Sequence, residues 1–168
     1  MTQNNQPLDL EKALHRIRQS LTPASSTEII DLTAAGQRIL AIDVIAPVSL
    51  PPFPASAMDG YALSLPQDEA VGSHPYTVVG ASLAGHPWTG TLSAKECVRV
   101  FTGALVPNGA NQVIPQEEVA NNDLEAQSVR FKPHQPSESF VRGVGHDIEQ
   151  GQTLLPKGTR LSAFALGS

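Results

Sequence analysis

Hydrophobic residues near the start of the chain recur with the period of an α-helix. Between Asp9 and Leu21 the apolar positions recur at helical intervals, and polar or charged residues fill the gaps: Leu10, Ala13, Leu14, Ile17 and Leu21. This spacing places the apolar side chains on one face, and Thr22-Pro23 follows as a stop signal. The pattern predicts an amphipathic helix whose polar face is exposed to solvent.

Two shorter patterns follow this helix. Residues 27–32 are typical of a short strand, and residues 33–41 are typical of a short helix, although Gly36 lies inside it. Residues 42–46 then read as extended chain.

From Pro47 onward, prolines and glycines separate strand-sized apolar segments, which is typical of all-β units. The acidic, Asn-rich segment 119–127 favours an exposed hairpin connection. A domain boundary is expected near Pro47. The predicted strands are 60–64, 76–81, 96–102, 111–116, 128–132, 139–141 and 153–155.

The last segment, 161–166, is apolar and helix-like. Exposed apolar surface of this kind usually implies a missing partner or a continuation of the chain. We therefore expect the chain to be part of a longer protein.

Composition narrows the possible classes. The single Cys97 lies in an apolar run, which favours a buried, reduced thiol and a cytoplasmic protein. No run approaches the roughly 20 apolar residues of a membrane span, and the polar start lacks the features of a signal peptide. We expect no association with a membrane.

The charges and the spacing of His and Cys residues argue against a nucleic-acid-binding protein and against a structural zinc site. The 16 acidic and 11 basic residues give a formal net charge of −5 and are dispersed, so no basic stripe is available for nucleic acid. The 5 histidines are far apart, and with one cysteine they match none of the short ligand spacings of structural zinc sites.

Residues 51–62, Pro-Pro-Phe-Pro-Ala-Ser-Ala-Met-Asp-Gly-Tyr-Ala, form the most informative segment. The prolines fix φ and keep the approach extended, and the permissive Gly60 follows Asp59. Stiff backbone therefore presents Ser56 and the Asp59 carboxylate. The alternative is an ordinary β-turn at Asp59-Gly60 that packs a loop against the core.

Two other segments end predicted strands. Phe101-Thr102-Gly103-Ala104 offers a hydroxyl and free backbone N–H groups that can hold an anion, although a plain turn has the same sequence. Pro115-Gln116-Glu117-Glu118 places paired carboxylates after an apolar strand, and its alternative is a charged strand end.

A glycine-rich loop at 141–148 brings Arg142, His146 and Asp147 together. Arg142 can hold a phosphate in a bidentate contact, and Asp147 can coordinate magnesium or fix that arginine. The alternative is a local Arg142–Asp147 ion pair that only orders the loop.

These segments resemble, in order, motifs of the MoeA family, the molybdopterin molybdenumtransferases, whose eukaryotic relatives include the E domain of gephyrin. The likeness extends from about residue 8 to the last residue. It departs at Pro54-Ala55-Ser56, where the family usually has Asp-Asn-Ser, and at His146, where it has Glu. The matching segments are the leading helix 10–21, Gly36 to Asp43 for the GR-L-A-x-D segment, Ser56 to Ala62 for SAMDGYA, Phe101 to Ala104 for the TGA turn, Val113 to Glu117 for the QE strand end, and Arg142 to Asp147 for the R-x-x-GED loop.

The resemblance implies an enzyme that inserts molybdate into adenylylated molybdopterin with Mg²⁺, downstream of a molybdopterin adenylyltransferase. It implies an α+β, mostly β fold. Residues 7–46 and 143–168 would form a discontinuous linker subdomain that makes a homodimer, and 47–142 would form an inserted, barrel-like β subdomain. The pterin-binding and C-terminal subdomains of the family would be absent, so we expect this chain to be inactive alone.

The same resemblance assigns roles to the candidate residues. Asp59 and Asp147 would be cleft carboxylates and possible Mg²⁺ ligands, with Thr102 as a donor beside them. Ser56, Arg142 and Glu117 would bind substrate. An acidic chain with an anionic substrate needs magnesium or basic residues from elsewhere.

Two alternatives come from other classes. A gephyrin-like interaction scaffold would show an exposed apolar strip, which the sequence does not clearly show. A stand-alone dimerisation or regulatory domain would tolerate loss of the Asp59 and Asp147 carboxylates.

Overall fold

The computed structural model describes residues 9–22, 26–66, 69–123 and 125–167. The chain divides into two compact units, Met1–Asp43 with Pro156–Ser168, and Val44–Leu155. The subdomain limits expected from the family resemblance stay a prediction.

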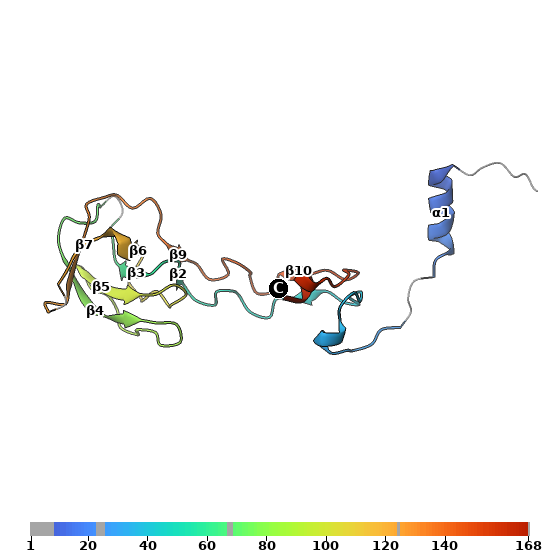
Figure 1. Cartoon of the computed structure of the whole chain (residues 1–168), viewed down its shortest axis with the longest axis horizontal. Coiled ribbons are helices and arrows are strands. Elements are labelled where there is room, and N and C mark those ends of the chain that lie inside the picture. Colours follow the sequence, from blue (N-terminus) through green and yellow to red (C-terminus); the bar gives the residue numbers. More distant parts are fainter. Residues whose placement is uncertain (1–8, 23–25, 67–68, 124, 168) are drawn as a thin grey trace, which may run out of the picture. The chain divides into compact units, whose positions relative to one another are not determined.

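The first unit contains the predicted amphipathic helix as α1, Leu10–Ser20, with Asp9 at the N-cap position (Figure 1). The apolar side chains of α1 are exposed: Leu10 by 69% and Ile17 by 53%. The unit also contains a short 3-10 helix η1, Leu32–Ala34, and the short helix α2, Ala163–Gly167, which overlaps the predicted apolar run 161–166.

Two predictions for this unit are wrong. Residues 27–32 form no strand, because no strand in the described part of the chain pairs with them. The helix predicted at 33–41 is reduced to η1, because Gln37 adopts a left-handed φ of 67° and its N–H donates to the carbonyl of Leu161 at 2.8 Å. The backbone then forms a bridge between Ile39 and Arg160 instead of helical hydrogen bonds.

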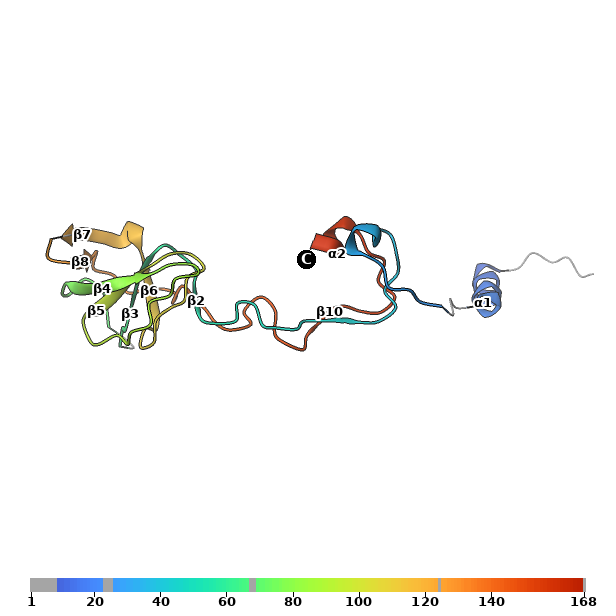
Figure 2. The same ribbon diagram turned by 90° about the horizontal axis from the view of Figure 1, so that it is seen from below.

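The second unit is built around a six-stranded sheet that curls into a half-barrel (Figures 1 and 2). The mostly β prediction is confirmed. Neighbouring strands are antiparallel except for β4 and β5, which are parallel. The spatial order is β6 (Gln112–Pro115), β3 (Gly60–Leu63), β5 (Glu96–Val100), β4 (Tyr76–Ser82), β8 (Ser128–Phe131) and β7 (Val119–Asp123).

β7 corrects one prediction, because 119–127 was expected to be only a connection. Its polar residues pair with β8, with Asn122 opposite Val129. Four of its five residues are exposed, as an edge strand allows. Composition alone therefore hid a strand.

Apolar side chains pack on both faces of β3. Tyr61 and Leu63 belong to a cluster with Tyr76 and Phe131, while Ala62 packs on the other face with buried valines of β5 and β6. This division follows from the two-residue period of a strand. Both faces of β3 are buried, so this strand holds the residue before it, Asp59, at a fixed position in the fold.

Two short pairs extend from the sheet. β1 (Val44–Ile45) pairs with β10 (Thr153–Leu155), and β2 (Ala55–Ser56) pairs with β9 (Val141–Arg142). The strand predicted at 139–141 is thus displaced toward Arg142. The β2–β9 pair brings the predicted segments 51–62 and 141–148 side by side.

Candidate functional site

Asp59 and Thr102, 43 residues apart in sequence, are joined in the structure. The Asp59 Oδ1 atom accepts hydrogen bonds from the Thr102 backbone N–H and from its Oγ1 hydroxyl, both at 2.8 Å. These two bonds, with a smaller contribution from the Arg99 charge, lower the pKa of Asp59 below its ordinary value of 3.8 against a partial desolvation. Asp59 is therefore a fixed, ionised carboxylate at neutral pH.

The backbone around Ser56 explains why the two segments meet. The Ser56 N–H donates to the carbonyl of Ala104 at 2.9 Å, and the Gly103 N–H donates to the carbonyl of Ser56 at 2.8 Å. Gly103 has a φ of 81°, which suits glycine at this turn. The turn after β5 is thereby laid against β2.

Ser56 itself is 1% exposed. Its hydroxyl donates to the carbonyl of Met58 at 2.6 Å and shapes the loop that carries Asp59. The hydroxyl thus acts within the loop in this structure.

The predicted Gln116-Glu117 segment forms the short helix η2, Gln116–Glu118. The Gln116 N–H donates to the carbonyl of Asp59 at 3.0 Å, so η2 lies against the Asp59 loop. Glu117 is exposed, and its Oε1 accepts from the Gln116 side-chain amide at 3.3 Å.

Arg142 and Asp147 form an ion pair. The Asp147 N–H donates to the carbonyl of Leu50 at 2.9 Å, and the Gly145 N–H donates to that of Pro51 at 2.9 Å. The loop is therefore docked on the start of the proline-rich segment. The local Arg142–Asp147 ion pair, which the sequence offered as an alternative, is therefore present. Asp147 is paired with Arg142, whereas Asp59 accepts its hydrogen bonds from Thr102.

Arg99 belongs to this site and was missed in the sequence. Its Nη1 donates to the carbonyl of Gly60 at 3.0 Å, and its Nη2 donates to Oε1 of Gln116 at 2.5 Å. The guanidinium carbon lies 5.1 Å from the centre of the Tyr61 ring and 4.8 Å from that of Phe101. Only its position in the middle of a β5 strand otherwise rich in apolar residues could have drawn attention to it.

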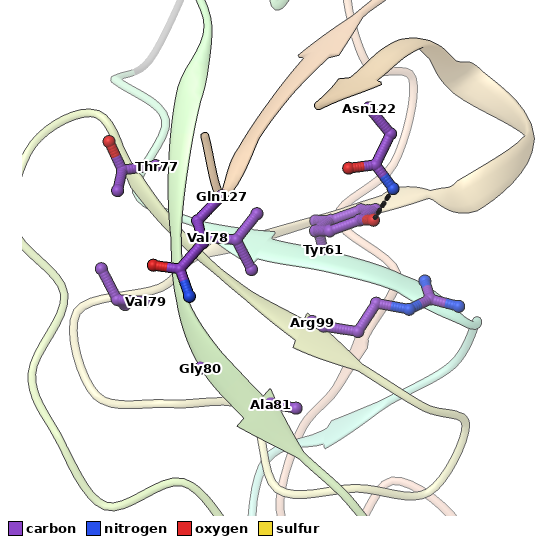
Figure 3. A pocket seen from close by; sticks show the side chains of 9 residues that line it. All are labelled: Tyr61, Thr77, Val78, Val79, Gly80, Ala81, Arg99, Asn122 and Gln127. Carbon is purple, nitrogen blue, oxygen red and sulfur yellow. Dashed lines mark hydrogen bonds between the residues drawn. The ribbon is translucent and has the colours of Figure 1, made fainter. Parts of the chain in front are cut away.

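A cavity of about 700 Å³ adjoins Arg99 on the sheet (Figure 3). The Asn122 amide donates to the Tyr61 hydroxyl at 3.5 Å on one side of it. Its lining residues are Tyr61, Thr77, Val78, Val79, Gly80, Ala81, Arg99, Asn122 and Gln127.

The side chains around Asp59 can be compared with the ligands that Mg²⁺, the ion implied by the family resemblance, requires. The described residues contain no group of three or more His, Cys, Asp or Glu side chains suited to a metal. Both hydrogen bonds to Asp59 fall on Oδ1, and Oδ2 has no hydrogen-bond partner among the described residues. One free carboxylate oxygen fits Mg²⁺, which is often held by one or two carboxylates together with water and substrate phosphates.

Within the part of the chain that the structure describes, no helix combines the length and the hydropathy needed to cross a membrane. α1, the longest of them, has 11 residues.

Comparisons with known proteins agree with the order of the segments. The family model for the MoeA N-terminal region (domain I and II) matches residues 8–168. The molybdopterin molybdenumtransferase of Haemophilus influenzae is 35% identical over 95% of this chain and 38% of its own length. That of Synechococcus elongatus is 37% identical over 83% of this chain and 35% of its own length.

Solved structures give the same result. The crystal structure of the molybdopterin biosynthesis MoeA protein from Pyrococcus horikoshii OT3 has a TM-score of 0.79 and 29% identity, and the match covers 94% of this chain and 41% of that chain. This chain therefore spans less than half the length of the relatives it matches. Because the family model matches residues 8–168 and so nearly all of the chain, the chain belongs to the MoeA family.

Proposed function

We propose that this chain is the Asp59-bearing N-terminal part of a molybdopterin molybdenumtransferase, which inserts molybdate into adenylylated molybdopterin. Relatives that carry this name match 95% and 83% of the chain. The observation that carries the proposal is the Asp59 carboxylate, held on Oδ1 by two hydrogen bonds from Thr102 with Oδ2 left without a partner among the described residues.

A carboxylate held in this way is suited to work on an anionic substrate through a cation. Its lowered pKa keeps it ionised, and the Thr102 bonds fix its direction in advance. Asp59, and in second place Asp147, would hold Mg²⁺. When bound, the ion supplies charge neutralisation between the carboxylate and the substrate phosphate oxygens.

The other residues act around Asp59. Thr102 orients the carboxylate through both of its donors. Arg142 anchors the 141–148 loop through Asp147 and can turn its remaining donors to an anion. Ser56 and Glu117 shape the loops on either side, and a contact of either side chain with substrate is part of the proposal.

We also propose a homodimer in the cytoplasm that receives its substrate from a molybdopterin adenylyltransferase. Support for an interface comes from α1 and its C-cap residue Leu21, because the apolar side chains of Leu10, Ile17 and Leu21 are exposed by 69%, 53% and 66%. An amphipathic helix with an exposed apolar stripe is suited to pack against a second copy. Light scattering of the purified protein measures the mass of the assembly, and a monomer at all concentrations would refute this part.

Asp59→Asn in the intact gene product tests the function. The amide keeps the shape but loses the charge, so we expect molybdenum insertion to fall by about 100-fold or more, the size of effect seen when a preorganised electrostatic group is lost. The assay measures the molybdenum bound to the pterin product. Asp31→Asn is the matched control, because Asp31 is exposed and makes no side-chain cap hydrogen bond.

Full activity of both Asp59→Asn and Asp147→Asn would refute the catalytic proposal and favour a dimerisation or regulatory domain. Retained peptide binding together with no molybdenum insertion by the intact wild-type protein would favour the gephyrin-like scaffold. The 168-residue chain by itself should insert no molybdenum, and activity of that chain alone would contradict the incomplete-site proposal.

A further inference from the structure

Arg99 contacts each of the segments that meet at Asp59. We propose that Arg99 is a positioning residue, which holds the Asp59 backbone and its Thr102 partner in the geometry that the reaction needs. The role in catalysis rests on the proposed function, but the clamp itself is a property of the folded chain and can be measured without activity.

The backbone of Asp59 is held on both sides through Arg99. Its Nη1 donates to the carbonyl of Gly60, the next residue, at 3.0 Å. Its Nη2 donates to the side chain of Gln116 at 2.5 Å, and the Gln116 N–H donates to the carbonyl of Asp59 at 3.0 Å. A shift of Asp59 therefore requires one of these bonds to lengthen.

The third contact reaches the segment that carries the donor of the Asp59 side chain. The guanidinium lies 4.8 Å from the centre of the Phe101 ring, and Phe101 immediately precedes Thr102. On the Asp59 side it lies 5.1 Å from the Tyr61 ring. The guanidinium of Arg99 thus contacts both the segment of the carboxylate and the segment of its donor.

Arginine suits this position for a geometric reason. A guanidinium has five N–H donors in a rigid plane and stacks on aromatic rings, whereas a lysine ammonium is a flexible point charge. Lysine can replace the charge and one hydrogen bond, but not both bonds and both ring contacts together. Core packing by β5 is provided by Val98 and Val100 on either side of Arg99, which are fully buried. Arg99 is therefore not needed to fill the core.

Amide hydrogen exchange of the chain tests the clamp directly. Arg99→Met keeps an apolar stem but removes both donors, so we expect the Thr102 and Gln116 amides to exchange about tenfold faster, as loss of a hydrogen bond or two implies. The Leu65 amide is the matched control, because it also donates to a side-chain oxygen, Oδ1 of Asn111 at 2.9 Å. Its exchange should change by less than about twofold.

A second variant covers the case in which Arg99→Met weakens the whole unit. Gln116→Ala removes one acceptor from an exposed side chain, and we expect a smaller acceleration at Thr102, about threefold. The double variant should resemble Arg99→Met, because both changes act on the same clamp. An unchanged Thr102 amide in both variants, or equal acceleration at Leu65, overturns the inference.

Kinetics of the intact protein test the consequence for the reaction. We expect Arg99→Met to lower kcat for molybdenum insertion by about tenfold with KM altered by less than about threefold, and Arg99→Lys to recover part of kcat. Wild-type kcat in Arg99→Met overturns the positioning role. If Asp59→Asn keeps full activity, the proposed function is refuted. The hydrogen-exchange measurement on Arg99→Met still tests the Arg99 contacts, because it does not depend on activity.

Discussion

Replacement of Gly60 by alanine tests the packing that fixes Asp59 in place. A Cβ atom on Gly60 would lie 2.1 Å from the Ile114 carbonyl oxygen and 2.9 Å from its carbonyl carbon. Both atoms belong to the backbone of β6, which pairs with β3 at Gly60 and Pro115. No side-chain rotation can relieve this contact.

The size of the effect follows from the distances. Ordinary van der Waals contact begins at 3.4 Å, so β6 would have to withdraw by about 1.3 Å from a strand to which it is hydrogen-bonded. Overpacking costs about 1–3 kcal/mol, and a backbone obstacle places Gly60→Ala at about 3 kcal/mol. For a unit of this size that corresponds to a fall in Tm of roughly 10 °C.

Thermal unfolding followed by tryptophan fluorescence measures this change in the chain itself. The sequence has 1 tryptophan, Trp88, which packs against the core of the same unit. Gly143→Ala is the control, because a Cβ there would meet nothing within 4 Å and its φ is outside the left-handed range.

We expect Gly143→Ala to stay within about 2 °C of the wild type. A Tm for Gly60→Ala equally close to the wild type would show that β6 yields without cost. That result would refute the claim that β3 and β6 fix the Asp59 loop.

The remaining predictions concern Asp59, Cys97 and the core. Because Thr102 lowers the pKa of Asp59, the ionised Asp59 carboxylate stabilises the fold above pH 3.8, and this stabilisation is lost as the pH falls through the lower pKa of the folded state. Thr102→Val should therefore raise the pKa of Asp59 in a carboxyl NMR titration. An unchanged pKa would contradict the assigned cause. Burial raises the pKa of the Cys97 thiol to about 12, so at pH 8 a thiol reagent should modify the native chain at least about 100-fold more slowly than the chain in denaturant, and equal rates would argue against burial. Phe131 is 0% exposed, and Phe131→Ala should cost about 3–5 kcal/mol in urea unfolding, whereas Phe164→Ala, at 87% exposed, should cost little; similar losses in the two variants would contradict the assigned core.

Local sequence patterns predicted the helices and strands whose conformation is set by nearby residues, or whose distant partners do not convert them to another type of structure. The helix α1 followed from apolar spacing, and β10, Thr153–Leu155, was predicted at its observed limits. The same reasoning failed at 33–41, where hydrogen bonds to residues 159–161 replaced helical ones. Those partners are more than 100 residues away in sequence, and no local window contains them.

The candidate site divides in the same way. The sequence singled out Asp59, because prolines and glycine around a carboxylate are a local signal, and it marked Thr102 as a donor at a turn. It could not show that the two side chains are hydrogen-bonded to each other, since that depends on the register of β3 with β5. For Arg99 the local signal was only its place among the apolar residues of β5, because its partners come from the turns and strands around it.

The sequence by itself therefore determined the family, the helix, most strands and the identity of the carboxylate-bearing loop. The helix, the strands and the loop follow from side-chain periodicity and from the fixed φ of proline, which act over a few residues. The family follows from the resemblance of the ordered motifs to those of MoeA proteins. Only the tertiary structure decided which atoms meet: the parallel β4–β5 neighbours, the Asp59–Thr102 bonds and the Arg99 clamp. The physical reason is that hydrogen bonds between distant segments form only after the sheet has fixed its register.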